Sequence, residues 1–341
     1  MKRMATITVL LAAAGSLAAP CRGQEPGPSY EHIKFLEPLV GNWKLVLKEG
    51  GRIVSNGQER SEWILNKSFM RQVGWGQIDG QPVQYEFWNG WNPKTQEVFQ
   101  WAVGATDTGY AIIVRTGAFD PARRVLTAQD RTIGSDGREN TAKVDLQLAD
   151  QNSYTMAFTE RRTDNVAAPD QHSSYSRAPA VAAPPLDATP GPGYEHLKFL
   201  DFSVGKWKME GDLPDGRYLG EEVKEWVFDK NFIHTKGWGK PGDKDRIDYE
   251  LLTGWDPAKK KVFIWFVGSD GSVGTREGTY DAAKNRLISS STAVDASGVE
   301  SAATVEEQYI DKNRFLMQFT NGTRGGRPQP DVEGTATRIG P

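Results

Sequence analysis

Residues 30–44 read YEHIKFLEPLVGNWK, and residues 194–208 read YEHLKFLDFSVGKWK. The second stretch repeats the pattern of the first, including the Val-Gly-x-Trp at its end. Such an echo within one chain indicates an internal repeat, whose extent has to be settled before single motifs are interpreted.

The repeat continues along the whole chain. Residues 90–93 read GWNP and residues 254–257 read GWDP, while 117–120 read GAFD and 278–281 read GTYD. The offset between matching positions drifts only from 164 to 161 residues along the chain. The sequence therefore predicts two tandem copies of one domain.

These landmarks set the expected domain boundaries. The first copy spans 29–178 and the second spans 193–339. Residues 179–192 between them are rich in Pro and Ala, which predicts a semi-rigid linker. Each copy is of ordinary domain length and is much longer than the repeat unit of a solenoid.

The first 23 residues are typical of a secretory signal peptide. Lys2 and Arg3 precede a short apolar run over 7–19 that is too short to span a bilayer. We therefore expect an exported protein, periplasmic or secreted. Cys21 is the single cysteine and has no disulfide partner within the chain, and Pro20 before it argues against a lipoprotein cleavage site.

Composition narrows the class of protein further. The chain is 38% hydrophobic and 25% charged, with a formal net charge of −3, and it has no basic runs. This balance is typical of a soluble globular protein and argues against nucleic-acid binding. Past the leader, no apolar stretch predicts a transmembrane segment. The 36 glycines and 11 tryptophans favour strands and turns.

Within each copy the apolar residues recur with the period of a β-strand. Residues 83–87 alternate between apolar and polar side chains, and so do residues 247–251. In 98–103, Phe99, Trp101 and Val103 form one face, while Gln100 and Ala102 form the other. That second face becomes Ile264 and Phe266 in copy two, which suggests a surface exposed in one copy and covered in the other. In copy one a short helix is expected near 30–38, and strands near 41–49, 57–65, 68–76, 82–91, 96–103, 109–118, 123–131, 138–148, 152–161 and 172–177.

A sheet of this many consecutive antiparallel strands removes its edges by closing into a barrel. We therefore predict an all-β fold of two tandem up-and-down barrels of nine to ten strands, each preceded by a short helix. A helix followed by Gly-x-Trp and such a barrel resembles the lipocalin and calycin superfamily. Within it the chain is most similar to an uncharacterised bacterial family of lipocalin-like domains, which implies no established activity. The residues that carry the resemblance are His32, Phe35, Val40, Gly41, Trp43, Trp63, 90–93 and 117–120, with their counterparts His196, Phe199, Val204, Gly205, Trp207, Trp226, 254–257 and 278–281.

Candidate site residues are those retained by both copies or able to line a barrel. By analogy with lipocalins, Trp43 and Trp207 are expected to pack in the core, whereas the other tryptophans either line a cavity or fill it. A glutamate and an arginine pointing inward would orient a ligand carboxylate or hydroxyl; pointing outward, they form a cross-strand ion pair. The alternation places Glu86 outward and leaves Glu62 and Arg115 open. The candidate ligand-binding residues are Glu62, Tyr85, Trp101, Arg115, Glu225, Tyr249, Trp265 and Arg276.

No metal or cofactor is expected. His32 and His196 have no second histidine or cysteine at ligand spacing. Haem-binding barrels of the superfamily use a late histidine, and His172 falls there in copy one, but Glu333 replaces it in copy two.

Three functions remain open at this point. The first is binding of a small hydrophobic or amphipathic ligand in one or both barrels. The second is an enzyme of the decarboxylase or isomerase type, with an interior set of Tyr85, Arg115 and Glu62 or of Tyr249, Arg276 and Glu225. The third is a structural pair of filled barrels. The sequence does not indicate an oligomeric state.

Overall fold

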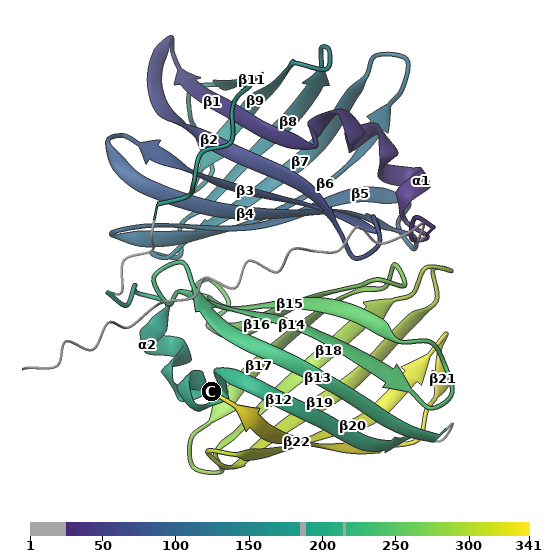
Figure 1. Cartoon of the computed structure of the whole chain (residues 1–341). Helices are drawn as coiled ribbons and strands as arrows, with labels where there is room; N and C mark the ends of the chain where they lie inside the picture. Colours follow the sequence, from purple (N-terminus) through teal and green to yellow (C-terminus); the bar gives the residue numbers. More distant parts are fainter. Residues whose placement is uncertain (1–24, 185–188, 214–215) are drawn as a thin grey trace, which may run out of the picture.

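The computed structural model describes residues 25–184, 189–213 and 216–341 (Figure 1). The predicted signal peptide and part of the predicted linker lie outside these residues. The described chain forms two antiparallel β-barrels, each preceded by a short helix (Figure 1). This confirms the all-β fold class and the tandem arrangement.

Barrel 1 is a closed meander of ten strands. Strand β9 pairs with both β8 and β11, and β11 closes the barrel by pairing with β1, while the two-residue β10 extends the edge of β9. Its elements are α1 (Tyr30–Ile33), η1 (Lys34–Leu39), β1 (Gly41–Glu49), β2 (Arg52–Ile64), β3 (Phe69–Ile78), β4 (Gln81–Asn92), β5 (Glu97–Thr106), β6 (Gly109–Asp120), β7 (Val125–Gly134), β8 (Glu139–Leu148), β9 (Ser153–Thr163), β10 (Val166–Ala167) and β11 (Gln171–Arg177).

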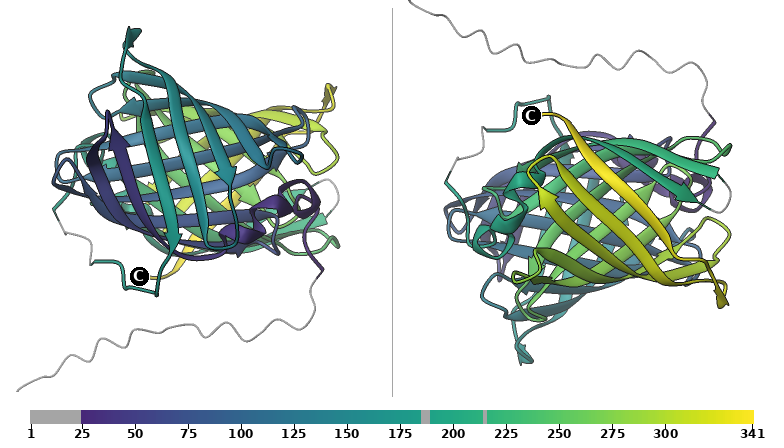
Figure 2. Two further views of the ribbon diagram at one scale, coloured as in Figure 1. Left: turned by 90° about the horizontal axis from the view of Figure 1, so that it is seen from above. Right: turned by 90° about the horizontal axis from the view of Figure 1, so that it is seen from below.

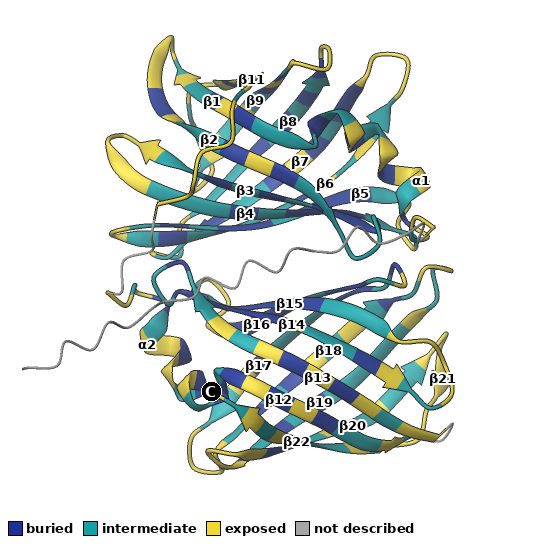
Figure 3. Ribbon diagram, in the orientation of Figure 1, coloured by how far each residue is buried: buried dark blue, intermediate teal, exposed yellow. Residues whose placement is uncertain are grey.

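Barrel 2 repeats this topology, with β22 closing onto β12. Its elements are α2 (Tyr194–Leu197), η2 (Lys198–Ser203), β12 (Gly205–Leu213), β13 (Gly216–Val227), β14 (Phe232–Pro241), β15 (Ile247–Asp256), β16 (Lys261–Gly268), β17 (Val273–Asp281), β18 (Arg286–Val294), β19 (Glu300–Asp311), β20 (Arg314–Arg324), β21 (Arg327–Pro328) and β22 (Val332–Gly340). Figure 3 shows exposed and buried residues alternating along β13, as expected for a strand with one face inside a barrel.

The ten strands predicted for copy one each overlap a strand of barrel 1. The largest difference is β2, which begins at Arg52 because the β1–β2 hairpin turns at Gly50 and Gly51, both with positive φ. Among the described residues, no helix is long and apolar enough to cross a bilayer.

The Gly-x-Trp motif joins each helix to its barrel. Trp43 is fully buried and donates from Nε1 to the Leu39 carbonyl at 2.6 Å. The Arg177 guanidinium lies 4.0 Å from the centre of the Trp43 ring and donates to the Pro38 and Val40 carbonyls. Trp207 and Arg338 repeat the arrangement in barrel 2. The last strand is thereby tied to the first.

The contact between the Arg177 guanidinium and Trp43 requires a glycine at position 41. Gly41 has φ +124°, and a Cβ there would lie 2.4 Å from Nη1 of Arg177. We expect Gly41→Ala to lower the free energy of unfolding by about 1–3 kcal/mol, measured by denaturant titration. Gly50→Ala is the control, because Gly50 has φ +54°, in the left-handed region that other residues can adopt, and an added Cβ there meets nothing within 4 Å. A cost for Gly41→Ala no larger than for Gly50→Ala would contradict the combined backbone strain and crowding expected at Gly41.

The two barrels pack against each other through equivalent strands. Outward-facing side chains of β5 and β16 form one buried apolar cluster, in which Trp101 stacks on Trp265 with ring centroids 5.4 Å apart. Because equivalent residues meet, the contact has the character of an isologous dimer interface within one chain. Figure 2 shows the stacked barrels from above and below.

This packing corrects one prediction. Gln100 and Ala102 do not form a surface, because they are 3% and 0% exposed and lie inside barrel 1. Their counterparts Ile264 and Phe266 lie inside barrel 2. The opposite face, with Trp101, is the one covered by the other barrel.

Candidate ligand cavity in barrel 2

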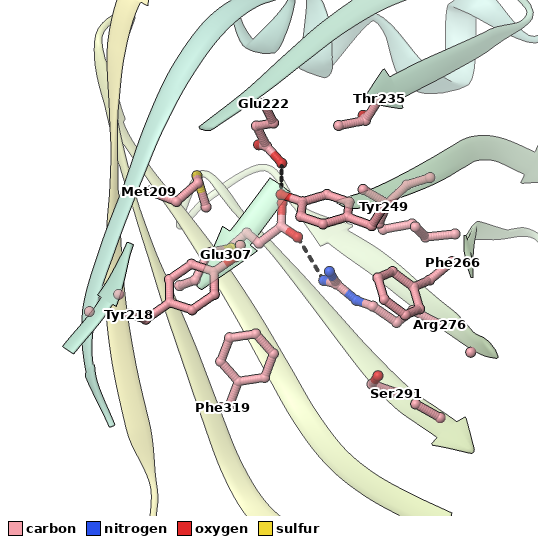
Figure 4. Close-up of a pocket in the computed structure, with 18 of the residues that line it drawn as sticks. Met209, Tyr218, Glu222, Thr235, Tyr249, Phe266, Arg276, Ser291, Glu307 and Phe319 are labelled. Atoms are coloured by element: carbon pink, nitrogen blue, oxygen red, sulfur yellow. Dashed lines mark hydrogen bonds and ion pairs between the residues drawn. The ribbon is translucent and has the colours of Figure 1, made fainter. Parts of the chain in front are cut away.

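A cavity of about 520 Å³ occupies the interior of barrel 2 (Figure 4). Side chains from strands all around the barrel line it. It extends from Leu200 of η2 to Leu213 and Val332, which lie at the opposite ends of the strands. Its volume and mainly apolar lining are those of a small-molecule site.

A few polar side chains converge within this apolar lining. Tyr249 donates to Oε2 of Glu222 at 3.1 Å, and Arg276 donates to Oε1 of Glu307 at 2.7 Å (Figure 4). Lys224 Nζ lies 2.9 Å from Oε1 of Glu222. Two cations and two carboxylates are therefore paired within the cavity.

Burial and charge shift the proton affinities of these groups. Burial acts to raise the pKa of Glu307, but the charges of Arg276 and Lys224 outweigh it, so that its pKa is lowered. Burial raises the pKa of Tyr249 far above its usual value, and the charge of Glu222 adds to the rise. The hydroxyl of Tyr249 therefore stays protonated and acts as a donor.

Barrel 1 carries larger side chains at several of the equivalent positions. The strand registers of the two barrels match, so the pairs follow directly from the ladders. The opposite holds for Phe266 in place of Ala102, Lys224 in place of Ser61 and Tyr218 in place of Ser55. Six cavity-lining residues of barrel 2 replace larger ones: Gly211 for Leu47, Thr235 for Gln72, Leu251 for Phe87, Thr253 for Asn89, Gly274 for Ile113 and Ser291 for Asp130.

A polar network occupies the interior of barrel 1 instead. Glu59 is 3% exposed and accepts hydrogen bonds from Tyr154 at 2.9 Å, Tyr85 at 3.0 Å and Gln72 at 2.7 Å. Arg115 is paired with Asp130, and its guanidinium lies over the ring of Phe87. These groups satisfy one another, so among the described residues the interior of barrel 1 leaves no free polar partner for a ligand.

Comparison with known proteins gives a family without an assigned activity. A family model described as a protein of unknown function, DUF1579, matches residues 27–176 and again residues 191–338. The chain belongs to the DUF1579 family. No functionally curated protein has a detectably similar sequence. Among solved structures, a protein of unknown function of the DUF3598 family from Nostoc punctiforme is 9% identical, with 90% of this chain and 99% of that chain covered. The TM-score is 0.22, which does not establish a common fold.

The two segments that match DUF1579 contain all the candidate residues predicted from sequence. The structure places four of these residues inside the barrels and four on outer faces. Tyr249 and Arg276 line the cavity of barrel 2. Tyr85 and Arg115 occupy the equivalent places inside barrel 1, where Glu59 and Asp130 already bind them.

The other four candidates lie outside the barrels. Trp101 and Trp265 stack between the two barrels and do not line the cavity. Glu225 is exposed, and Glu62 pairs with Arg71 on the outer face. The interior glutamate of each DUF1579 repeat is instead Glu59 or Glu222.

Sequence reasoning missed this interior pair, although a signal for it was present. Glu59 and Glu222 correspond at the same offset as Trp63 and Trp226. Glu59 shares the parity of Trp63 along β2, and Trp63 packs against the barrel 1 core, whereas Glu62 has the opposite parity. Because alternate residues of a strand share a face, counting by two from Trp63 would have selected Glu59 as the interior glutamate.

A second charged cluster lies between the barrels of this DUF1579 chain. Ligand atoms of Glu86, His234 and Glu250 lie within 4.8 Å of one another, all three are buried, and they are the set among the described residues that could hold a metal ion. Each already has a partner: Glu86 accepts from Trp88 at 2.6 Å, and Glu250 contacts His234 at 2.7 Å and Arg71 at 3.4 Å. Burial acts to raise the pKa of Glu250, but His234 and Arg71 outweigh it and the pKa is lowered. The cluster acts as an ion-pair network that joins the barrels.

Proposed function

We propose that this protein binds a small amphipathic molecule in the cavity of barrel 2, while barrel 1 has a filled, structural interior. The observation that carries the proposal is the cavity itself, together with the six smaller residues that open it relative to barrel 1. Substitution of large by small side chains in one copy only is what a repeat would accumulate after one barrel became a binding site.

The same observation favours binding over catalysis. The glutamates of the predicted enzymatic sets, Glu62 and Glu225, lie on outer faces. The carboxyl whose pKa is raised by burial is Glu59, and it lies inside barrel 1, surrounded by its own donors. An acid–base enzyme combines a carboxyl group of raised pKa with an open cavity in one place. Here the carboxyl group of raised pKa lies in barrel 1 and the cavity lies in barrel 2.

Export completes the proposal. The leader-like composition of residues 1–23 supports export to the periplasm or out of the cell as part of this proposal. An exported barrel with an apolar cavity is suited to carry or sequester a poorly soluble molecule.

Binding of diphenylhexatriene to the full chain tests this function, because this apolar probe fluoresces only in apolar surroundings. We expect saturable binding at one site. The triple variant Thr235→Gln, Leu251→Phe, Thr253→Asn gives barrel 2 three of the interior side chains of barrel 1, and we expect it to weaken probe binding while circular dichroism stays that of a β-barrel.

Glu225→Gln is the control for this experiment, since Glu225 lies on the outer face of the same barrel. It should bind the probe as the wild type does. No probe binding in the wild type, or equal binding by the triple variant, would refute the cavity as a ligand site.

A further inference from the structure

Glu59 and Glu222 occupy the same position in the two barrels but have different partners. In barrel 1 the carboxylate of Glu59 is surrounded by donors from the protein: Tyr154, Tyr85 and Gln72 bind it, and Ser61 lies 3.5 Å away. This is a fully satisfied buried acceptor.

Barrel 2 lacks two of these donors. Thr235 stands in place of Gln72 and Phe315 in place of Tyr154, while Lys224 replaces Ser61 and forms an ion pair with Glu222. The retained hydrogen bond is the one from Tyr249 to Oε2 of Glu222.

The second oxygen of this carboxylate consequently has a single partner. Glu222 is 6% exposed, and among the described residues its Oε1 makes no hydrogen bond of good geometry and has only Lys224, whose Nζ lies 2.9 Å away, as an ion-pair partner. Glu222 lines the cavity. A carboxylate oxygen can accept more than one hydrogen bond, so Oε1 keeps acceptor capacity toward the space that a ligand would fill.

The cations of the cavity are already neutralised. Arg276 is bound by Glu307 at 2.7 Å, and Lys224 is paired with Glu222 at 2.9 Å. A charged ligand group of either sign would therefore meet no unpaired counter-ion among the described cavity residues. An uncharged hydroxyl can still donate to Oε1 of Glu222, whose one partner is Lys224.

From this difference, and building on the proposed function, we propose that the ligand of barrel 2 has an apolar body and an uncharged hydrogen-bond donor at its polar end, an alcohol, which binds Glu222. The ligand's donor takes the place that Gln72 and Tyr154 hold in barrel 1. A carboxylate or ammonium head group is disfavoured, because the charged groups of the cavity already pair with one another.

Displacement of bound diphenylhexatriene by a matched series tests the proposal on the full chain. The competitors are decane, decanol, decylamine and decanoic acid, which share the length of the apolar chain and differ at the polar end. We expect decanol to displace the probe at concentrations about 10-fold or more below decane, since a hydrogen bond to a charged group contributes roughly that factor. We also expect decanol to bind more tightly than decanoic acid and decylamine, whose charges find no unpaired partner in the cavity.

Two variants assign the preference to Glu222. Glu222→Gln removes the negative charge, and we expect it to improve decanoic acid relative to decylamine by about 10-fold. Thr235→Gln restores the donor of barrel 1 beside Glu222, and we expect it to weaken decanol more than decane. Glu225→Gln, on the outer face, should leave the series unchanged.

The outcomes separate this inference from the proposed function. If the probe does not bind, both fail. If the probe binds but decanoic acid displaces it as well as decanol does, or if Glu222→Gln leaves the order unchanged, the cavity binds ligands and the donor-headed class is refuted.

Discussion

Glu59→Leu is expected to lower the free energy of unfolding by about 3–5 kcal/mol, because it leaves buried donors without their acceptor. The hydroxyls of Tyr85 and Tyr154 and the amide of Gln72 all donate to this carboxylate. Each unpaired buried donor costs about 1–3 kcal/mol, and the three costs overlap because the groups share one acceptor.

Glu59→Gln is the matched control for this loss. Its carbonyl oxygen keeps one acceptor in the same place, so we expect a smaller cost in a denaturant titration of the full chain. Equal costs for the leucine and glutamine variants would contradict the view that hydrogen-bond acceptance by Glu59 holds the interior together.

The pH dependence gives an independent check on Glu59. Burial raises its pKa, and the hydrogen bonds from Tyr154, Tyr85 and Gln72 offset this only in part. The native state therefore holds the proton to higher pH than the unfolded chain, in which the pKa of a glutamate is about 4.3. Stability from this group is complete below that pH and is lost as the pH rises through the raised native value, with a slope of at most about 1.4 kcal/mol per pH unit. The difference in unfolding free energy between the wild type and Glu59→Gln should decline across that interval, and a difference that grows would contradict the raised pKa.

Trp88→Ala is expected to cost about 3–5 kcal/mol, as large-to-small changes of buried aromatic residues do. Trp88 points outward from barrel 1, yet it is 1% exposed because barrel 2 covers it. Its Nε1 also donates to Glu86, which lies in the buried charged network between the barrels. The truncation therefore opens a cavity and removes a donor from a buried carboxylate.

Unfolding monitored by tryptophan fluorescence and circular dichroism measures this loss. Trp88→Leu is the control, since leucine is the residue that barrel 2 carries at the equivalent position, Leu252. It should retain part of the apolar contact and cost less than alanine. If Trp88→Ala has no effect on stability, the packing of the two barrels in this arrangement is wrong.

The sequence by itself determined the tandem repeat, the all-β class and the closed barrels. The repeat of Gly-x-Trp and of the Gly-Trp-Asn/Asp-Pro turns fixes where each copy begins and where its strands reverse. Period-two alternation places the strands, and ten consecutive antiparallel strands have no open edge once they close. These features depend on local residues and their order, which a single sequence contains.

Only the tertiary structure decided which face of each strand is inside. Alternation separates inside from outside when the outer face meets water, but in β5 and β16 the outer face is apolar too, because the other barrel covers it. The sequence therefore predicted Trp101 and Trp265 as ligand-binding residues, although they pack between the barrels. It predicted Gln100 on an exposed surface, although this residue lies inside barrel 1. The smaller set of donors around Glu222 becomes visible only when the two interiors are compared in three dimensions, since the donors that Glu59 has and Glu222 lacks come from strands distant in the sequence.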